Sequence, residues 1–244
     1  MTTKVDFESL IGWSPTFAPC SRCKAETTRS PCWDCLKRED AERAVREAEK
    51  VVGIPDGFVW ARRGTVEIAE RVKTAAGWSV VLDAVTGFSG TTVLLIGSES
   101  RVGKTSMACA ALRELPGGLF TRASGLARAG GEHPMGQGSA PLIRRAKAAR
   151  VLVIDEFGGP DYPLHLEHFV LDVLWSRHEE RHLTIVTTGL TEGAIEGRCG
   201  QGTMGRLREK GSCLTVRFGS PQAREQDPRQ GQLGQVTSPS PGAS

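Results

Sequence analysis

A short stretch between an apolar run and a helix-forming segment has the residue types and spacing of a phosphate-binding loop. Such a loop reads G-x-x-x-x-G-K-[ST], because backbone N–H groups and a helix N-terminus surround the phosphates, the lysine reaches the terminal phosphates and the hydroxyl binds Mg²⁺. Gly103, Lys104 and Thr105 fit, while Ser98 replaces the first glycine and Gly97 precedes it. A serine is tolerated there if its φ stays negative. The predicted nucleotide-binding residues of the loop are Ser98, Glu99, Ser100, Arg101, Val102, Gly103, Lys104, Thr105 and Ser106.

Two carboxylates, Asp155 and Glu156, directly follow the apolar run VLVI. A nucleotide site needs a carboxylate at the end of a neighbouring strand to hold Mg²⁺ through water, and a second acid to polarise the attacking water. The carboxyl ends of the strands form the ligand-binding edge of open α/β sheets. We therefore predict that Asp155 holds magnesium and Glu156 activates water; the alternative is a strand followed by an acidic turn without a chemical role.

Hydroxyl and guanidinium groups further along the chain are candidates for contact with the terminal phosphate. The run LTIVTTG ends in Thr187 and Thr188, which could sense that phosphate or simply end a strand. A Gly-rich stretch then offers Arg198, Arg206 and Arg208. One of these could be an arginine finger supplied to a neighbouring subunit, a contribution on the order of 10³–10⁵ in rate. Solvated surface arginines are the alternative.

Four cysteines follow the spacing C-x2-C-x8-C-x2-C. Two C-x-x-C pairs joined by a short loop can present four thiolates to one Zn²⁺ at about 2.3 Å each. Redox dithiols and two disulfides are disfavoured, because a thioredoxin-type site has one such pair near a βαβ unit. We predict a structural zinc module, which folds only with its metal, with the ligands Cys20, Cys23, Cys32 and Cys35.

The surroundings of the cysteines suit single-stranded nucleic acid, through charge and stacking, or a protein partner. The basic and aromatic residues concerned are Arg22, Lys24, Arg29, Trp33, Lys37 and Arg38.

Five short runs of aliphatic and β-branched residues predict strands that are buried on both faces. Helix-length segments between them give the alternation that a mostly parallel sheet with helices on both faces requires. The sequence therefore predicts an α/β fold. The predicted strands are Thr91–Gly97, Gly118–Ala123, Val151–Asp155, Leu183–Thr188 and Cys213–Phe218, and the clearest helices are Thr105–Leu115, Pro141–Ala149 and His165–Glu180.

The composition changes along the 244 residues, which suffice for one main domain and a small appendage. The expected division is a zinc-binding module at 1–36, a helical linker at 37–60, a nucleotide-binding domain at 61–219 and a tail at 220–244. The tail is rich in Pro, Gly, Gln and Ser, so it is predicted to be disordered.

Charge and hydropathy narrow the cellular setting. The formal net charge of +3 identifies no nucleic-acid partner. No apolar run approaches the roughly 18 residues of a membrane span, and the first residues lack the pattern of a signal peptide. Paired and isolated cysteines suit a reducing compartment. We expect a soluble, cytoplasmic protein without a membrane partner.

In their order along the chain, these motifs resemble those of the AAA+ ATPases of the DnaC-like helicase-loader and transposition-helper family. The resemblance runs from Cys20 to Phe218 and includes GIPDGF, the phosphate loop, VLVIDEFG, RHLTIVTTGL and GRCGQGTMGRLREKG. The TTGL stretch before a Gly-rich arginine segment, and the lack of a C-terminal helical lid, narrow it to this branch. It implies an AAA+ P-loop fold preceded by a zinc knuckle.

The resemblance also implies roles for individual residues. Lys104, Glu156 and Arg206 would be catalytic, Arg206 acting as a finger across a subunit interface. ATP and Mg²⁺ would bind at Lys104 and Thr105, Asp155 would hold the metal, and Thr188 would lie near the sensor position. Ser98 and Arg101 replace loop glycines, and Gly189 stands where many relatives have an asparagine; these departures concern the rate of hydrolysis more than binding.

The implied activity is ATP hydrolysis, slow and stimulated by DNA or a partner, in the loading of a replicative helicase onto single-stranded DNA by an oligomer. Two alternatives stay open: a transposition helper that binds double-stranded DNA and a transposase, and a non-hydrolysing adaptor with ATP as a latch. Basic residues that could line a DNA path, or form a solvated helix face, are Arg122, Arg128, Arg144, Arg145 and Lys147.

Overall fold

The computed structural model describes residues 18–27, 30–64, 78–134, 136–200, 205, 209 and 211–218. The chain forms two compact units, Met1–Val51 and Val52–Ser244. In these described segments, no helix combines the length and the apolar character needed to cross a bilayer. The tail predicted to be disordered lies outside the described residues.

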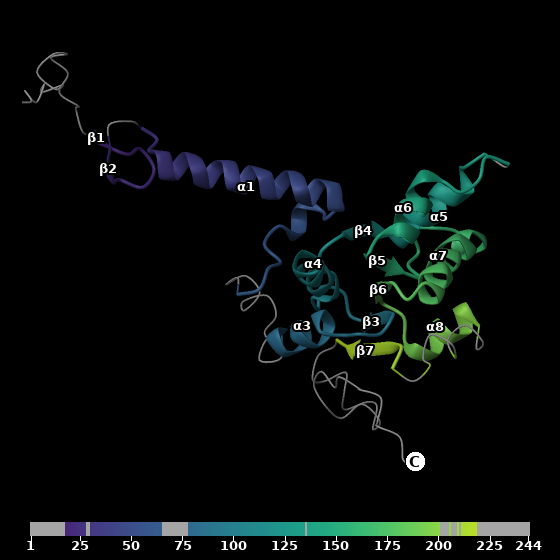
Figure 1. The fold of residues 1–244 in the computed structure, drawn as a ribbon. Helices are drawn as coiled ribbons and strands as arrows, with labels where there is room; N and C mark the ends of the chain where they lie inside the picture. Colours follow the sequence, from purple (N-terminus) through teal and green to yellow (C-terminus); the bar gives the residue numbers. More distant parts are fainter. Residues whose placement is uncertain are drawn as a thin grey trace, which may run out of the picture. The chain divides into compact units, whose positions relative to one another are not determined.

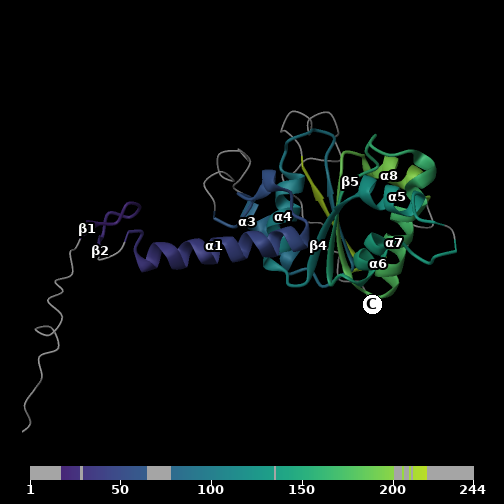
Figure 2. The same cartoon turned by 90° about the horizontal axis from the view of Figure 1, so that it is seen from above.

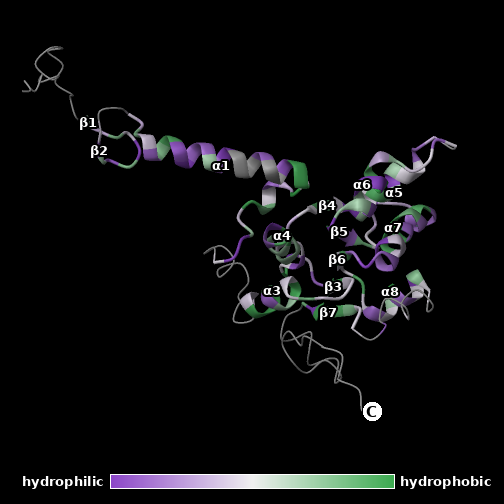
Figure 3. Ribbon diagram, viewed as in Figure 1, coloured by the Kyte–Doolittle hydropathy of each residue, from purple (hydrophilic) through white to green (hydrophobic). Residues whose placement is uncertain are grey.

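The described part of the first unit contains a small hairpin and a long helix. Strand β1 (Ala18–Pro19) pairs antiparallel with β2 (Glu26–Thr27), and α1 spans Trp33–Val52. Hydrophilic residues occupy most of the length of α1 (Figure 3). Since α1 begins at Trp33, it includes Cys35 and continues past the boundary expected at residue 36.

The second unit is built on a five-stranded parallel sheet with the order β4-β5-β6-β3-β7. Aliphatic residues fill its central strands, and every residue of β3 is buried. All five predicted strands and the parallel pairing are confirmed. The strands are β3 (Thr92–Ile96), β4 (Gly118–Arg122), β5 (Val151–Phe157), β6 (Leu183–Thr188) and β7 (Cys213–Arg217).

Helices cover both faces of the sheet, as predicted (Figure 1; Figure 2). Successive strand residues point to opposite faces, so Val93 packs in the core under α3 (Trp78–Thr86) and α4 (Lys104–Glu114), whereas Leu94 packs in the core on the other side. The remaining helices cover that second face. They are α5 (Ala123–Gly131), α6 (Pro141–Ala148), α7 (Glu167–Glu179) and α8 (Glu192–Cys199), and short 3₁₀ turns lie at η1 (Asp56–Phe58) and η3 (Leu164–Leu166).

Strand β6 lies between the strand of the phosphate loop and the strand of the acid pair. β3 pairs with β6 and β7, whereas β5 pairs with β4 and β6. The expectation that the two motif-bearing strands are neighbours is therefore wrong. Because all the strands are parallel, their carboxyl ends share one edge, and the last residues of β6 stand between the two motifs.

A buried arginine fastens α7 to α6 and β6. The Arg177 side chain is fully buried. Its Nε donates to Thr184 Oγ1 at 2.9 Å, its Nη1 to Ala146 O at 2.8 Å and its Nη2 to Leu183 O at 2.6 Å. Burial lowers the pKa of Arg177 to about 10, so the guanidinium is still protonated at neutral pH. It satisfies carbonyl groups at the end of α6, which a helix leaves without partners.

Replacing Arg177 by methionine should lower the free energy of unfolding by about 3 kcal/mol, because several buried carbonyl oxygens lose their donor. Urea denaturation measures this directly. Arg150→Met, the same change at an exposed arginine, should stay close to wild type. A wild-type midpoint for Arg177→Met would contradict the assigned role.

Candidate functional site

The loop between β3 and α4 leads into a helix N-terminus. Gly103 has φ 99 and directly precedes α4, and Arg101 has φ 63. A non-glycine residue in this region carries roughly 1–2 kcal/mol of backbone strain. Ser98 is not among the described residues that have a positive φ. It therefore meets the condition under which a serine can replace the first glycine of the loop. The first N–H groups of α4 lack intrahelical acceptors, so they suit an anion.

Gly97 begins this loop in close contact with the chain that follows β7. A Cβ on Gly97 would lie 2.4 Å from the carbonyl oxygen of Phe218. The backbone N–H of Phe218 donates to Ile96 O at 2.7 Å, so the two segments cannot separate without losing a hydrogen bond. Packing against this segment therefore requires glycine at position 97, one residue before the position that the motif specifies.

The ammonium group of Lys104 is held against the backbone of the loop. Its Nζ donates to Gly97 O at 2.6 Å and to Glu99 O at 2.7 Å. Burial lowers the pKa of Lys104, and the carboxylates of Asp155 and Glu99 act in the opposite direction. An anion bound by the loop would meet this positive charge directly.

The carboxylate of Asp155 joins three elements. It is 3% exposed, and its Oδ1 accepts hydrogen bonds from Thr105 Oγ1 at 2.8 Å and from Thr187 Oγ1 at 2.6 Å. Thr105 lies in the first turn of α4, and Thr187 lies on β6. A buried charge requires such partners. The structure thus brings the predicted loop and the predicted acid together at the carboxyl edge of the sheet.

Glu156 lies in a bulge of β5, where the register against β6 shifts and Asp155 and Glu156 together oppose Thr187. The Thr187 hydroxyl also accepts a hydrogen bond from the backbone N–H of Glu156 at 3.0 Å. Glu156 has φ 59, its side chain is exposed, and its carboxylate lies 3.8 Å from Nε of Arg122. Bulges redirect side chains at functional edges, and this one turns a carboxylate to solvent beside Asp155.

The two threonines that end β6 make different contacts. Thr188 Oγ1 donates to Phe157 O at 2.7 Å and accepts from Leu190 N at 3.0 Å, so it supports the backbone around the site. Thr187, its neighbour, makes the contact with the acid pair. Strand alternation separates the two residues, but only the register of β6 against β5 shows which one faces Asp155.

The other predicted residues are placed as follows. Ser106 is buried in α4, and Arg206 and Arg208 lie outside the described residues. Arg198 forms an ion pair with the buried Glu167 at 2.6 Å. Its guanidinium is therefore occupied within its own chain, in contrast to the finger role considered for it.

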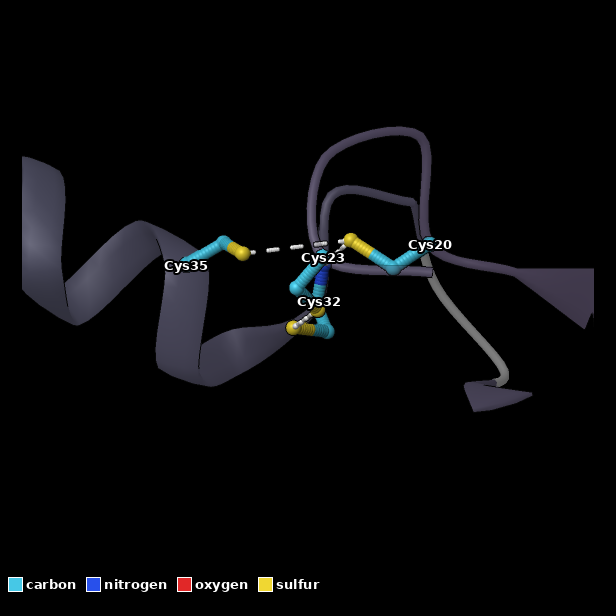
Figure 4. A group of neighbouring side chains, drawn as sticks. All are labelled: Cys20, Cys23, Cys32 and Cys35. Carbon is cyan, nitrogen blue, oxygen red and sulfur yellow. Dashed lines mark hydrogen bonds between the residues drawn. The ribbon is translucent and has the colours of Figure 1, made fainter. Parts of the chain in front are cut away.

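Figure 4 shows the four cysteine sulfurs of the first unit facing one another. All four lie within 4.8 Å of one another, with 3.9 Å between the Sγ atoms of Cys20 and Cys35 and 3.6 Å between those of Cys23 and Cys32. These are free thiols, because a disulfide bond measures about 2.05 Å. Tetrahedral zinc with bonds of about 2.3 Å has sulfur–sulfur edges of about 3.8 Å. The donor set and its spacing therefore fit zinc.

Local backbone geometry positions these thiols. The first pair lies in the turn between β1 and β2, whereas Cys32 directly precedes α1 and Cys35 lies in its first turn. Hydrogen bonds from the backbone of Cys23, Cys32 and Arg22 lower the pKa of the Cys20 thiol to about 5, whereas burial raises the pKa of Cys35 to about 12. The lowered pKa of Cys20 favours its thiolate, the form in which a cysteine binds a metal ion.

The arrangement of the second unit is found in known structures. The DnaC helicase loader is 19% identical over 68% of this chain and 100% of its own, with a TM-score of 0.50. A protein of Streptococcus pyogenes serotype M3, assigned as a primosome component, is 19% identical over 69% of this chain and 91% of its own, also with a TM-score of 0.50. The chain has the AAA+ P-loop fold. No protein-family model and no curated protein match the sequence. The similarity to these two structures confirms the AAA+ fold that the motifs predict.

Thr187→Val should lower the free energy of unfolding by about 1–3 kcal/mol, because Asp155 loses a buried hydrogen bond and the N–H of Glu156 loses its acceptor. Thr121→Val is the matched control: Thr121 is also buried on a strand but makes one hydrogen bond of 3.3 Å. Chemical denaturation compares the two. Equal losses would show that Thr187 has no special part in holding the acid pair.

Proposed function

We propose that this chain binds and hydrolyses ATP and acts in DNA replication by loading a replicative helicase onto single-stranded DNA. The observation that carries the proposal is the 2.8 Å contact between Thr105 Oγ1 and Asp155 Oδ1, beside a lysine held against the loop. A hydroxyl at the start of a helix and a carboxylate at the sheet edge are the groups that hold Mg²⁺ on a nucleotide.

Each residue of the site has a task in this proposal. Lys104 exchanges the carbonyl oxygens that it now contacts for phosphate oxygens. Thr105 and Asp155 hold Mg²⁺, which when bound neutralises charge on the phosphates. Glu156, exposed at the bulge, orients the attacking water. Arg206 of a neighbouring subunit completes the site, so the active form is an oligomer.

The role in replication is supported by the fold, which is similar to that of a helicase loader and an assigned primosome component. Two of the basic residues considered for a DNA path lie beside carboxylates. Lys147 pairs with Asp172 at 2.8 Å, and Arg122 lies beside Glu156. Arg128 on α5 and Arg144 and Arg145 on α6 are exposed, and we propose them as further contacts for the phosphate groups of DNA.

One observation favours a second candidate, an adaptor that binds ATP without hydrolysing it. The carboxylate of Glu156 lies 3.8 Å from a cation, Arg122, and an ion pair would compete with water for the carboxylate. ATP would then act as a conformational latch, and Glu156→Gln would change neither ATP binding nor the absence of phosphate release.

We also propose that Cys20, Cys23, Cys32 and Cys35 bind a structural zinc ion. The described part of the first unit has a two-residue strand pair and a largely hydrophilic helix. Among the described residues of this unit, the buried side chains are those of Cys20, Cys32 and Cys35, so metal binding supplies the folding free energy, about 10–16 kcal/mol in small zinc modules.

The purified chain should contain about one zinc ion, held by four thiolates, and Cys32→Ser should lose it because the tetrahedron lacks one ligand. Elemental analysis after dialysis measures the content. Cys213→Ser, a change outside the quartet, should retain the metal. A zinc-free wild type that also fails to take up Zn²⁺ under reducing conditions would contradict the site.

Lys104→Ala should weaken ATP binding by about tenfold to a hundredfold, because it removes a charge-assisted contact with the phosphates. Lys50→Ala, at an exposed lysine of α1, serves as the control. Calorimetry with a non-hydrolysable analogue measures the affinity. Unchanged affinity in Lys104→Ala would sink the proposed function.

Glu156→Gln should reduce turnover by about a hundredfold or more with binding retained, since the variant cannot accept a proton from water. Phosphate release with single-stranded or double-stranded DNA is the assay. Stimulation by single strands supports the loader, and stimulation only by double strands supports the transposition helper. Tight binding without turnover in the wild type supports the adaptor.

A further inference from the structure

An ion pair between the buried Glu167 and the partly buried Arg198 connects the first residue of α7 to the last turn of α8. Arg198 Nε lies 2.8 Å from Oε1 and 2.6 Å from Oε2 of Glu167. The Glu167 side chain is 4% exposed and that of Arg198 is 22% exposed. Taking two charges out of water is costly, and an apolar pair of similar volume is often as stable. Stability alone therefore does not account for the pair.

The pair also holds the chain that follows the acid pair. Arg198 Nη1 donates to Gly158 O at 3.0 Å. On the other side of the same residue, Gly158 N donates to the hydroxyl of Tyr162 at 3.2 Å, and that hydroxyl donates to Glu167 Oε1 at 3.3 Å. Both backbone polar groups of Gly158 are thus fixed by one network, to which Tyr162, Glu167 and Arg198 contribute.

A side chain at Gly158 would strain this network. Its φ is 72, and a Cβ there would lie 2.3 Å from Cδ1 of Leu190. Burial is the main cause that raises the pKa of Tyr162 to about 12, so its hydroxyl keeps the proton that it donates.

The fixed residue lies two positions after Glu156, on the far side of the bulge. Glu156 itself has φ 59 and an exposed side chain that lies beside Arg122, and its backbone oxygen accepts a hydrogen bond from Gly159 N at 3.1 Å. Thr187 accepts a hydrogen bond from the N–H of Glu156, and Arg198 and Tyr162 hold Gly158 two residues later. The direction of the Glu156 side chain therefore depends on both attachments.

We propose that Glu167, Arg198 and Tyr162 are positioning residues that set the direction of Glu156. The inference rests on the proposed function, in which Glu156 orients the attacking water. This inference gives Arg198 a positioning role within its own chain. That role differs from the role of an arginine finger, which acts on a neighbouring subunit. The same network links Gly158, two residues after Glu156, to α8, so a displacement of α8 would change the position of Glu156.

The test uses Tyr162→Phe, which removes only the hydroxyl, and Arg198→Lys, which keeps the charge but cannot contact Glu167 and Gly158 together. Arg217→Lys is the matched control, because Arg217 on β7 also pairs with a carboxylate of α8, that of Glu192, and belongs to no part of the network around Gly158. Steady-state ATPase kinetics and amide hydrogen exchange of residues 156–159 are measured for the full chain, together with its melting temperature.

Both variants should lower kcat by about tenfold or more, as expected when a reacting group is misplaced, with KM within about twofold of wild type. Exchange at Gly158 should accelerate in both, and Arg217→Lys should match wild type. Wild-type kcat in a folded Tyr162→Phe, or unchanged exchange at Gly158, would overturn the inference alone. A wild type without turnover would overturn the proposed hydrolysis and this inference with it.

Discussion

The buried carboxylate of Asp155 is the group on which the rest of the candidate site depends. An uncompensated charge in the interior costs several kcal/mol, and the hydroxyls of Thr105 and Thr187 provide the compensation here. This requirement fixes the start of α4 and the end of β6 against the end of β5. The order of the sheet, with β6 between β3 and β5, allows all three elements to meet.

Around this carboxylate, each further residue is held by a different physical constraint. Gly97 is required because a side chain would collide with the segment after β7. Glu156 projects to solvent because a bulge interrupts the register of β5. Arg198 is withdrawn from solvent because Glu167 is buried beside it. In the first unit, by contrast, the main constraint is the mutual approach of four thiols, which a metal ion would stabilise and which otherwise costs conformational entropy.

The strands and the main helices could be predicted because the sheet is buried on both faces, so runs such as LLI and VLVI are unambiguous. The order of the strands in the sheet could not be predicted, because the helices that connect parallel strands leave it open which strands pair. The positive φ values of Arg101 and Glu156 arise from loop closure and the bulge, for which a non-glycine residue gives no signal. In its Gly-rich context Arg198 was a candidate arginine finger, because its ion-pair partner Glu167 lies 31 residues away in the sequence. Thr187 and Thr188 are adjacent, and only the register of β6 against β5 shows which of them contacts Asp155.

The central claim is that the loop at Lys104 holds the phosphates of ATP, with magnesium at Thr105 and Asp155. A crystal structure of the full chain grown with Mg²⁺ and a non-hydrolysable ATP analogue tests it most directly. We expect a terminal phosphate oxygen within hydrogen-bond distance of Lys104 Nζ, and Mg²⁺ in contact with Thr105 Oγ1. A loop without nucleotide at saturating analogue, or an analogue bound elsewhere on the chain, would contradict the claim.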